Sequence, residues 1–324
     1  MTIQIMRIGI NGFGRIGRAL FRINLKDPRY EIVAVNDIDP NTENMAYLLI
    51  YDSIYGKLAQ DISANNQEQL LTVGDNQTKF YSGKSIKDVP WDLHKVDIIV
   101  DASGVHANLT ASRELLRQSA VKKVIVTFSP NEKIDKTIIF GVNEEEYDSS
   151  SDHIISTSIC DTNAAGPVLK LLDQKFGINH GYITTLHPWL GYQNLMDSTI
   201  QSVSSPGHFW DDFALGRAST MSLIPKRTTL VKALSNAIPD IGNKIHAFSF
   251  RVPTNIVTCS DMTIHLCQST SKEEINDLFN TVASSGRSVM GYQEDQLVSI
   301  DFKGIRESLI VDGRWTDVMN QTTV

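Results

Sequence analysis

One motif near the N-terminus constrains the fold of this chain more than any other feature. Residues 12–17 read GFGRIG, which has the spacing G-x-G-x-x-G. The motif follows an apolar run at 5–10 and precedes a helical pattern from Arg15 to about Lys26. A strand, a tight glycine turn and a helix in this order are typical of a dinucleotide-binding unit. The pyrophosphate would lie at the helix N-terminus, where amide groups and the helix dipole favour an anion.

The carboxylate of Asp37 indicates which dinucleotide binds. Residues 31–36 (EIVAVN) form the next predicted strand, and Asp37 follows it, about 20 residues beyond Gly17. A carboxylate at this place accepts hydrogen bonds from the adenosine ribose and would repel a 2′-phosphate. The sequence therefore predicts NAD rather than NADP, although a glycine-rich turn and a surface aspartate could coincide by chance.

The order of the predicted elements indicates two domains. Further apolar strands at 96–101, 123–127, 137–140 and 153–157, with a helix over 108–119, predict a parallel sheet covered on both faces. A helix and a small antiparallel excursion (69–73, 79–82) are expected between residues 44 and 91. Beyond Cys160, a helix over 163–176 leads into alternating strands at 181–186, 246–251, 257–266 and 297–301. We expect an α/β Rossmann domain over residues 1–157 and an α+β catalytic domain with a mostly antiparallel sheet over 158–324.

Composition limits the partners of the chain. The formal charge of −7, without a basic block, argues against nucleic acid as a main partner. Three cysteines give no disulfide framework, which favours a reducing compartment. No apolar run approaches the length of a membrane span, and no leader pattern opens the chain. We therefore expect a cytoplasmic protein with no membrane partner, and we expect no metal site.

Two residues have the chemistry of a catalytic pair. Cys160 lies just before an apolar-periodic helix, and a helix N-terminus stabilises a thiolate, which lowers the pKa of the thiol. The alternative is a small buried apolar side chain, which is the interpretation that we adopt for Cys259 and Cys267. His187 ends a predicted strand and precedes Pro188. It would therefore project from a strand tip, where catalytic bases commonly lie.

Several segments together resemble the glyceraldehyde-3-phosphate dehydrogenase family. They are RIGINGFGRIGR at 7–18, ND at 36–37, MAYL at 45–48, YDS at 51–53 and RVPT at 251–254. Residues 158–167 resemble the cysteine motif of that family, and His187 follows Cys160 at the interval expected for its catalytic base. The segments at 298–302 and 310–313 are more similar to the erythrose-4-phosphate dehydrogenase branch.

The resemblance implies NAD-dependent oxidation of a small, anionic, phosphorylated aldehyde through a thioester on Cys160, with His187 as the base. It implies a homotetramer, in which the loop 189–218 with Trp189, Phe209, Trp210 and Phe213 lies at a subunit interface. The implied cofactor-binding residues are Asn11, Gly12, Gly14, Arg15, Ile16, Gly17, Asp37, Ser103, Gly104 and Thr127. Arg217 and Arg251 match residues that hold a substrate phosphate in that family, and we expect Asp161, Lys226, Arg227 and Thr228 to line the same substrate site.

The sequence also departs from the pattern of that family. Ile159 stands where a serine usually donates to phosphate, Asp161 replaces a threonine, and Leu190 replaces a threonine that contacts substrate phosphate. The usual SSTG turn reads KRTT at 226–229, and the chain stops at Val324, before a WYDNE-type motif. Whether that last segment is truncated or absent stays open.

The lost phosphate donors favour hydrolysis of the thioester over phosphorolysis. Asp161 would raise the pKa of Cys160 and orient or deprotonate the attacking water, or it would only cap the helix. Phosphorylating glyceraldehyde-3-phosphate dehydrogenase activity and a non-catalytic NAD-binding paralogue are the alternatives.

Overall fold

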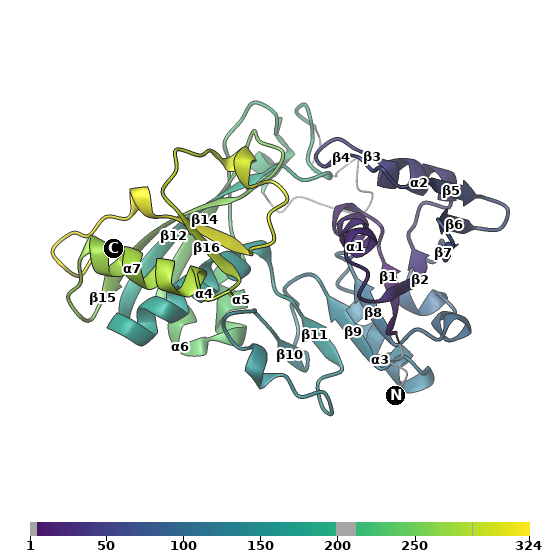
Figure 1. Cartoon of the computed structure of the whole chain (residues 1–324), viewed down its shortest axis with the longest axis horizontal. Helices are drawn as coiled ribbons and strands as arrows, with labels where there is room; N and C mark the ends of the chain where they lie inside the picture. The colour runs from purple at the N-terminus through teal and green to yellow at the C-terminus, as the bar shows by residue number, and fades with distance from the viewer. Residues whose placement is uncertain (1–4, 199–211, 287) are drawn as a thin grey trace. The chain divides into compact units, whose positions relative to one another are not determined.

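The computed structural model describes residues 5–198, 212–286 and 288–324 (Figure 1). The chain forms two compact units. Unit 1 comprises Met1–Ile138 and Glu145–Ser158, and unit 2 comprises Ile139–Glu144 and Ile159–Val324. The short segment Ile139–Glu144 belongs to unit 2 because Ile139 and Val142 pack there with Ala237.

Unit 1 is built on one large, mostly parallel sheet, as the sequence predicts. In the described residues the strand order is β10-β11-β9-β8-β1-β2-β7-β6-β5, and only the β7–β6 and β6–β5 pairs are antiparallel. The strands are β1 (Arg7–Asn11), β2 (Glu31–Asn36), β5 (Ile62–Asn65), β6 (Leu70–Val73), β7 (Asn76–Tyr81), β8 (Ile98–Asp101), β9 (Lys123–Val126), β10 (Lys136–Thr137) and β11 (Ile154–Ser156), with the small pair β3 (Tyr51–Asp52) and β4 (Gly56–Lys57) apart from the sheet. The helices are α1 (Arg15–Lys26), α2 (Thr42–Ile50) and α3 (Asn108–Gln118), with short 3-10 turns at Ile86–Asp88, Trp91–His94 and Glu144–Glu146.

Apolar side chains cover both faces of this sheet. One cluster contains Ile10 and Val35 from the strands and Phe21 from α1. The other contains Ile99 from β8 and Leu109 from α3. The continuous apolar runs in the sequence arise because central parallel strands are buried on both sides.

Unit 2 is an α+β fold. Its sheet has the order β13-β14-β12-β15, in which β13–β14 and β12–β15 are antiparallel and β14–β12 is parallel. The predicted mostly antiparallel sheet is therefore confirmed. The strands are β12 (Ile178–Pro188), β13 (Ile224–Lys226), β14 (Ile245–Val252), β15 (Cys259–Leu266), and the separate parallel pair β16 (Met290–Gln293) and β17 (Leu309–Asp312). The helices are α4 (Cys160–Phe176), α5 (Leu230–Ala237), α6 (Pro239–Gly242) and α7 (Lys272–Ala283), with 3-10 turns at Phe213–Gly216, Ser299–Phe302 and Gly313–Trp315.

The core of unit 2 positions the start of α4. Leu169 and Leu172 of this helix are buried against Ile183 of β12 and Ile264 of β15. The helix begins at Cys160 itself, three residues earlier than predicted, because Thr162 Oγ1 accepts a hydrogen bond from the Ile159 amide at 3.2 Å. Cys160 is therefore the first residue of the helix rather than part of the preceding loop.

Two predicted strands are wrong or shortened. The segment 297–301 holds a 3-10 turn instead of a strand, because Asp301 Oδ2 accepts from the Val298 amide at 2.8 Å and closes the chain locally. The strand predicted at 137–140 shrinks to Lys136–Thr137. Asn143 Oδ1 accepts from the Ile139 amide at 2.9 Å, which takes that amide out of the sheet.

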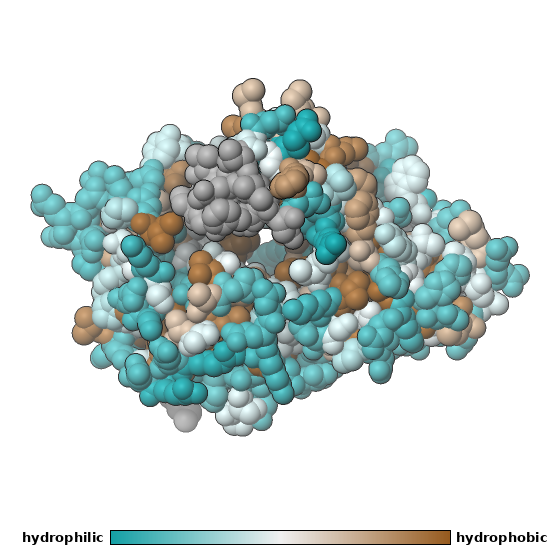
Figure 2. All heavy atoms as spheres, turned by 180° about the vertical axis from the view of Figure 1, so that it is seen from behind, coloured by the Kyte–Doolittle hydropathy of each residue, from teal (hydrophilic) through white to brown (hydrophobic). Residues whose placement is uncertain are grey.

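Among the described residues, the structure contains no helix that is long and apolar enough to cross a membrane. The face drawn in Figure 2 is mostly hydrophilic, and its apolar residues lie in separate patches.

Candidate active site

The three glycines of the G-x-G-x-x-G motif in unit 1 have the geometry that a bound pyrophosphate requires. Gly12 has φ of +92°, and a Cβ there would lie 2.5 Å from the Ser103 amide nitrogen. A Cβ on Gly17 would lie 2.2 Å from the carbonyl oxygen of Gly12. A Cβ on Gly14 would meet nothing within 4 Å. A side chain at Gly12 or Gly17 would therefore clash with the turn or with the packing of the helix. The open space beside Gly14 can accept a ligand, as in dinucleotide-binding loops.

Asp37 lies beside this loop at the end of β2. Its Oδ2 accepts from the Phe13 amide at 2.7 Å, and its Oδ1 accepts from the Asp39 amide at 3.1 Å. The carboxylate therefore holds the glycine loop and is itself held in place. It is only partly buried, so that a ribose hydroxyl could reach its remaining lone pairs.

A buried polar network joins the carboxyl ends of three strands. Asn11 Nδ2 donates to Asp101 Oδ1 at 2.9 Å, and Asn36 Nδ2 donates to Asn11 Oδ1 at 2.7 Å. Ser103 Oγ donates to the same Asp101 oxygen at 2.6 Å. Burial raises the pKa of Asp101 above its ordinary value, and its Oδ2 has no hydrogen-bond partner among the described residues. Asp101 was not predicted as a site residue, and Asn36 was noted only in the ND motif, although both are polar residues that end buried strands.

The other predicted cofactor residues surround the same edge. Arg15 and Ile16 are exposed in the first turn of α1. Gly104 is exposed with φ of +70°. The Thr127 amide donates to the Asp101 carbonyl at 3.1 Å, which places Thr127 just beyond β9.

Asp37→Ala should raise the Kd for NAD about tenfold, because hydrogen bonds to a charged acceptor contribute about 1.5–3 kcal/mol each. The Kd for NADP should change less, since the substitution also removes the repulsion of the 2′-phosphate. Fluorescence titration with each dinucleotide measures both constants, and Asp75→Ala, an exposed carboxylate in the β6–β7 turn, is the control. A wild-type protein that prefers NADP tenfold would contradict this role for Asp37.

In unit 2, Cys160, Asp161 and His187 form one cluster. Their sulfur, carboxylate oxygen and ring nitrogen all lie within 4.8 Å of one another. Asp161 Oδ1 lies 2.6 Å from His187 Nε2 and 3.8 Å from Cys160 Sγ. Asp161 and His187 are buried, and Cys160 keeps an accessible surface although protein atoms crowd around its thiol. The first turn of α4 and the last residues of β12 thus bring a thiol, a carboxylate and an imidazole together.

Two threonines orient the buried pair. Thr258 Oγ1 lies 3.2 Å from His187 Nδ1. Thr228 Oγ1 donates to Asp161 Oδ2 at 3.1 Å and accepts from the Leu230 amide at 3.1 Å. Thr258 lies just before β15, and no motif around it in the sequence indicates a role in the site. Both nitrogens of His187 therefore have a polar partner.

The pKa of Cys160 is raised to about 11, first by loss of hydration and then by the charge of Asp161. The backbone amides of both residues and the charge of Arg251 act in the opposite direction. The expectation that the helix N-terminus lowers this pKa is wrong for the net effect, because burial and an adjacent carboxylate outweigh the helix dipole. The expected effect of Asp161 on Cys160 is confirmed in direction.

The predicted anion-binding residues divide into two groups. Arg251 is buried, pairs with His187 across β12 and β14, and donates from Nη1 to the Pro188 carbonyl at 3.2 Å. Arg217 is exposed, and its Nε donates to Asp197 at 2.8 Å. Lys226 ends β13 and is half-buried, and the adjacent Arg227 is exposed. The structure thus brings Arg251 and Thr228 to the cluster and places Arg217 in a surface ion pair.

The loop predicted to reach a subunit interface is described only in part. Phe209 and Trp210 lie outside the described residues. Trp189 is half-buried, and Phe213 is 84% exposed.

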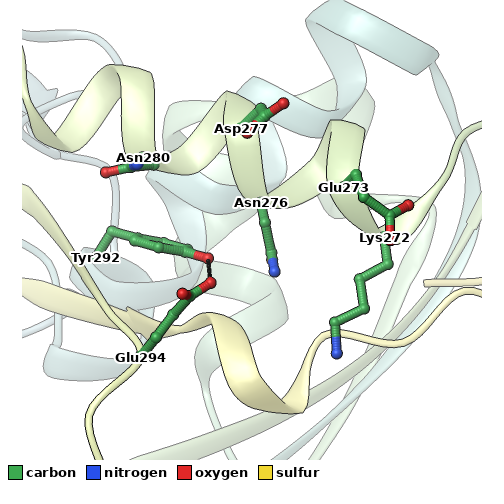
Figure 3. A pocket seen from close by; sticks show the side chains of 7 residues that line it. All are labelled: Lys272, Glu273, Asn276, Asp277, Asn280, Tyr292 and Glu294. Carbon is green, nitrogen blue, oxygen red and sulfur yellow. Dashed lines mark hydrogen bonds between the residues drawn. The ribbon is translucent and has the colours of Figure 1, made fainter.

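A separate hollow of about 420 Å³ lies between α7 and β16 (Figure 3). Its lining is polar, and Tyr292 Oη donates to Glu294 Oε1 at 2.5 Å on the side of β16. The side chains that line it are Lys272, Glu273, Asn276, Asp277, Asn280, Tyr292 and Glu294. This set contains neither a histidine nor a cysteine, so the chemistry of the chain is assigned to the Cys160 cluster.

A Rossmann unit with a dinucleotide loop, and an α+β unit with a helix-terminal cysteine beside a histidine, define a nicotinamide-dependent dehydrogenase. Residues 6–109 match the family model "Glyceraldehyde 3-phosphate dehydrogenase, NAD binding domain", and residues 159–324 match "Glyceraldehyde 3-phosphate dehydrogenase, C-terminal domain". The chain belongs to the glyceraldehyde-3-phosphate dehydrogenase family, as the sequence motifs predicted, and NAD is its cofactor.

Curated relatives match almost the whole chain. Glyceraldehyde-3-phosphate dehydrogenase 1 of Bacillus cereus is 33% identical over 98% of this chain and 91% of the relative. Glyceraldehyde-3-phosphate dehydrogenase 2 of Trichormus variabilis is 36% identical over 99% and 92%. The enzyme of Geobacillus stearothermophilus is 34% identical over 97% and 90%.

Proposed function

We propose that this protein oxidises a small phosphorylated aldehyde with NAD through a thioester on Cys160, and that water resolves the thioester. The observation that carries the proposal is the Cys160–Asp161–His187 cluster in a chain of this family. Residues 1–157 are the cofactor domain in this proposal, and residues 158–324 are the catalytic domain.

The side chains of the cluster support acylation. The Cys160 thiol is exposed, so the thiolate that forms when it releases its proton to solvent can attack the aldehyde carbon. Backbone amides in the first turn of α4 stabilise the oxyanion of the hemithioacetal. His187 then accepts the hydroxyl proton. Bound NAD supplies the chemistry of hydride acceptance.

The same side chains support hydrolysis. Asp161 and His187 form a buried hydrogen-bonded pair that can orient and deprotonate a water molecule. Ile159 cannot donate to an attacking phosphate, and the KRTT turn lacks the serines of the family pattern. Arg251 is buried, and its charge acts on Cys160, so it would hold an anionic substrate group, with Arg217, Lys226, Arg227 and Thr228 as the other proposed contacts.

The rate of NADH formation from phosphorylated aldehydes should change less than about twofold when inorganic phosphate is added, because water is the proposed acyl acceptor. Absorbance of NADH with a panel of such aldehydes, with and without phosphate, measures this directly. Product analysis should show a free acid. A strict requirement for phosphate would instead establish phosphorylating activity, and no turnover with any aldehyde, despite NAD binding, would establish a non-catalytic paralogue.

We also propose a cytoplasmic homotetramer, with the loop 189–218 at a subunit interface. The exposed side chain of Phe213 supports this proposal, since large apolar side chains at a surface favour burial in a partner. Light scattering at micromolar concentration should give the mass of four chains. A monodisperse monomer would contradict the proposed assembly.

A further inference from the structure

The Cys160 cluster holds three kinds of metal-ligating atom from two elements. A thiol and a carboxylate come from the first turn of α4, and an imidazole comes from the end of β12. All three ligand atoms lie within 4.8 Å of one another. Two of them are on buried residues, while the exposed Cys160 gives access from solvent.

We propose that Cys160, Asp161 and His187 form a site for a Zn²⁺ ion, which reversibly blocks the thiol. Zinc is held by cysteine sulfur, histidine nitrogen and carboxylate oxygen in a tetrahedral arrangement. Its bond lengths place such ligand atoms roughly 3.3–3.6 Å apart. Sγ and Oδ1 are already 3.8 Å apart, whereas Oδ1 and Nε2 are 2.6 Å apart and must separate as the ion replaces the proton between them.

Neighbouring side chains orient the ligands as in metal sites. Thr258 Oγ1 lies 3.2 Å from His187 Nδ1, which leaves Nε2 directed at the cluster. Thr228 Oγ1 donates to Asp161 Oδ2 at 3.1 Å, which directs Oδ1 toward the ion. Such outer hydrogen bonds strengthen metal binding by fixing the ring and the carboxylate.

The charges of the cluster select the ion. A thiolate and a carboxylate neutralise a divalent cation, so that the nearby positive charge of Arg251 is tolerated. Magnesium and calcium require oxygen ligands and octahedral or larger coordination, which this set does not offer. Three protein ligands leave the fourth position of zinc to water. A zinc ion bound there would block the sulfur that attacks the aldehyde in the proposed function. Zinc binding itself does not depend on that reaction.

Calorimetric titration of the metal-free full chain with ZnCl₂, without substrate, tests the site. We expect one ion per chain. Cys160→Ser and the nearly isosteric Asp161→Asn should each weaken binding about tenfold or more, because each removes one ligand. Cobalt titration should give a thiolate charge-transfer band that Cys160→Ser abolishes. Saturating Zn²⁺ should slow alkylation of Cys160 by iodoacetamide at least tenfold, measured by mass spectrometry.

Cys267→Ser and Asp261→Asn are the matched controls, since both lie in unit 2 outside the cluster, and they should bind Zn²⁺ as the wild type does. Circular dichroism and NAD binding show that each variant is folded. Unchanged Zn²⁺ affinity in folded Cys160→Ser or Asp161→Asn would overturn the site, as would the absence of one-to-one binding in the wild type. Aldehyde oxidation without Zn²⁺ binding would refute this inference alone, whereas Zn²⁺ binding without oxidation would refute only the proposed function.

Discussion

Cys160→Ser should lower kcat/KM for aldehyde oxidation by at least about 10⁴-fold, in line with the loss of a covalent nucleophile in other enzymes. A serine hydroxyl at this place is a far weaker nucleophile than a thiol, because very little of it is deprotonated near neutral pH. The Kd for NAD should stay within about twofold, since the glycine loop and Asp37 belong to unit 1. Steady-state NADH formation and a dinucleotide titration on the same preparation measure the two effects.

Cys267→Ser is the matched control for this substitution. Cys267 follows β15, and its amide donates to the Gly177 carbonyl at the C-terminal end of α4, whereas Cys160 begins that helix. Activity of this control should remain within about twofold of the wild type. If Cys160→Ser instead retained a tenth of the wild-type activity, a thioester on Cys160 would not be the route of oxidation.

Asp161→Thr should raise the rate of Cys160 alkylation near pH 7 by about tenfold. Burial and the Asp161 carboxylate together raise the pKa of Cys160 to about 11, so the reactive thiolate is rare at neutral pH. Removing the adjacent charge lowers this pKa by about one unit while the larger effect of burial stays, and each unit is a tenfold change in thiolate. The inflection of the alkylation profile should therefore move from about pH 11 to a lower pH.

The same substitution should slow turnover, because it removes the carboxylate that holds His187 Nε2 at 2.6 Å. Rapid mixing should show a burst of NADH followed by a slow phase, since acylation becomes easier while deacylation loses its oriented base. Asp261→Asn, beside Cys259 on β15, is the control and should leave both measurements unchanged. If Asp161→Thr left both the alkylation profile and turnover unchanged, Asp161 would have no role in catalysis and would only cap the helix.

The sequence alone determined the class of fold, the cofactor and the family. The helix Arg15–Lys26 and the strand Glu31–Asn36 have the predicted bounds, because apolar periodicity, a glycine turn and β-branched residues act within a short stretch of chain. The glycine spacing and Asp37 indicated NAD because they too lie within one short stretch of the chain. The strand predicted at 297–301 failed because one local hydrogen bond to Asp301 outweighed an alternating pattern.

Only the tertiary structure decided the electrostatics of the candidate site. Asp161 was singled out as unusual from the sequence, but its pairing with His187 and its hydrogen bond from Thr228 depend on strands far along the chain. Thr258 was not singled out, because nothing around it in the sequence indicates that it reaches a histidine ring. The sign of the pKa shift of Cys160 also required the structure. A helix terminus is a local feature and favours the thiolate, whereas burial depends on residues brought together from distant positions, and here burial dominates.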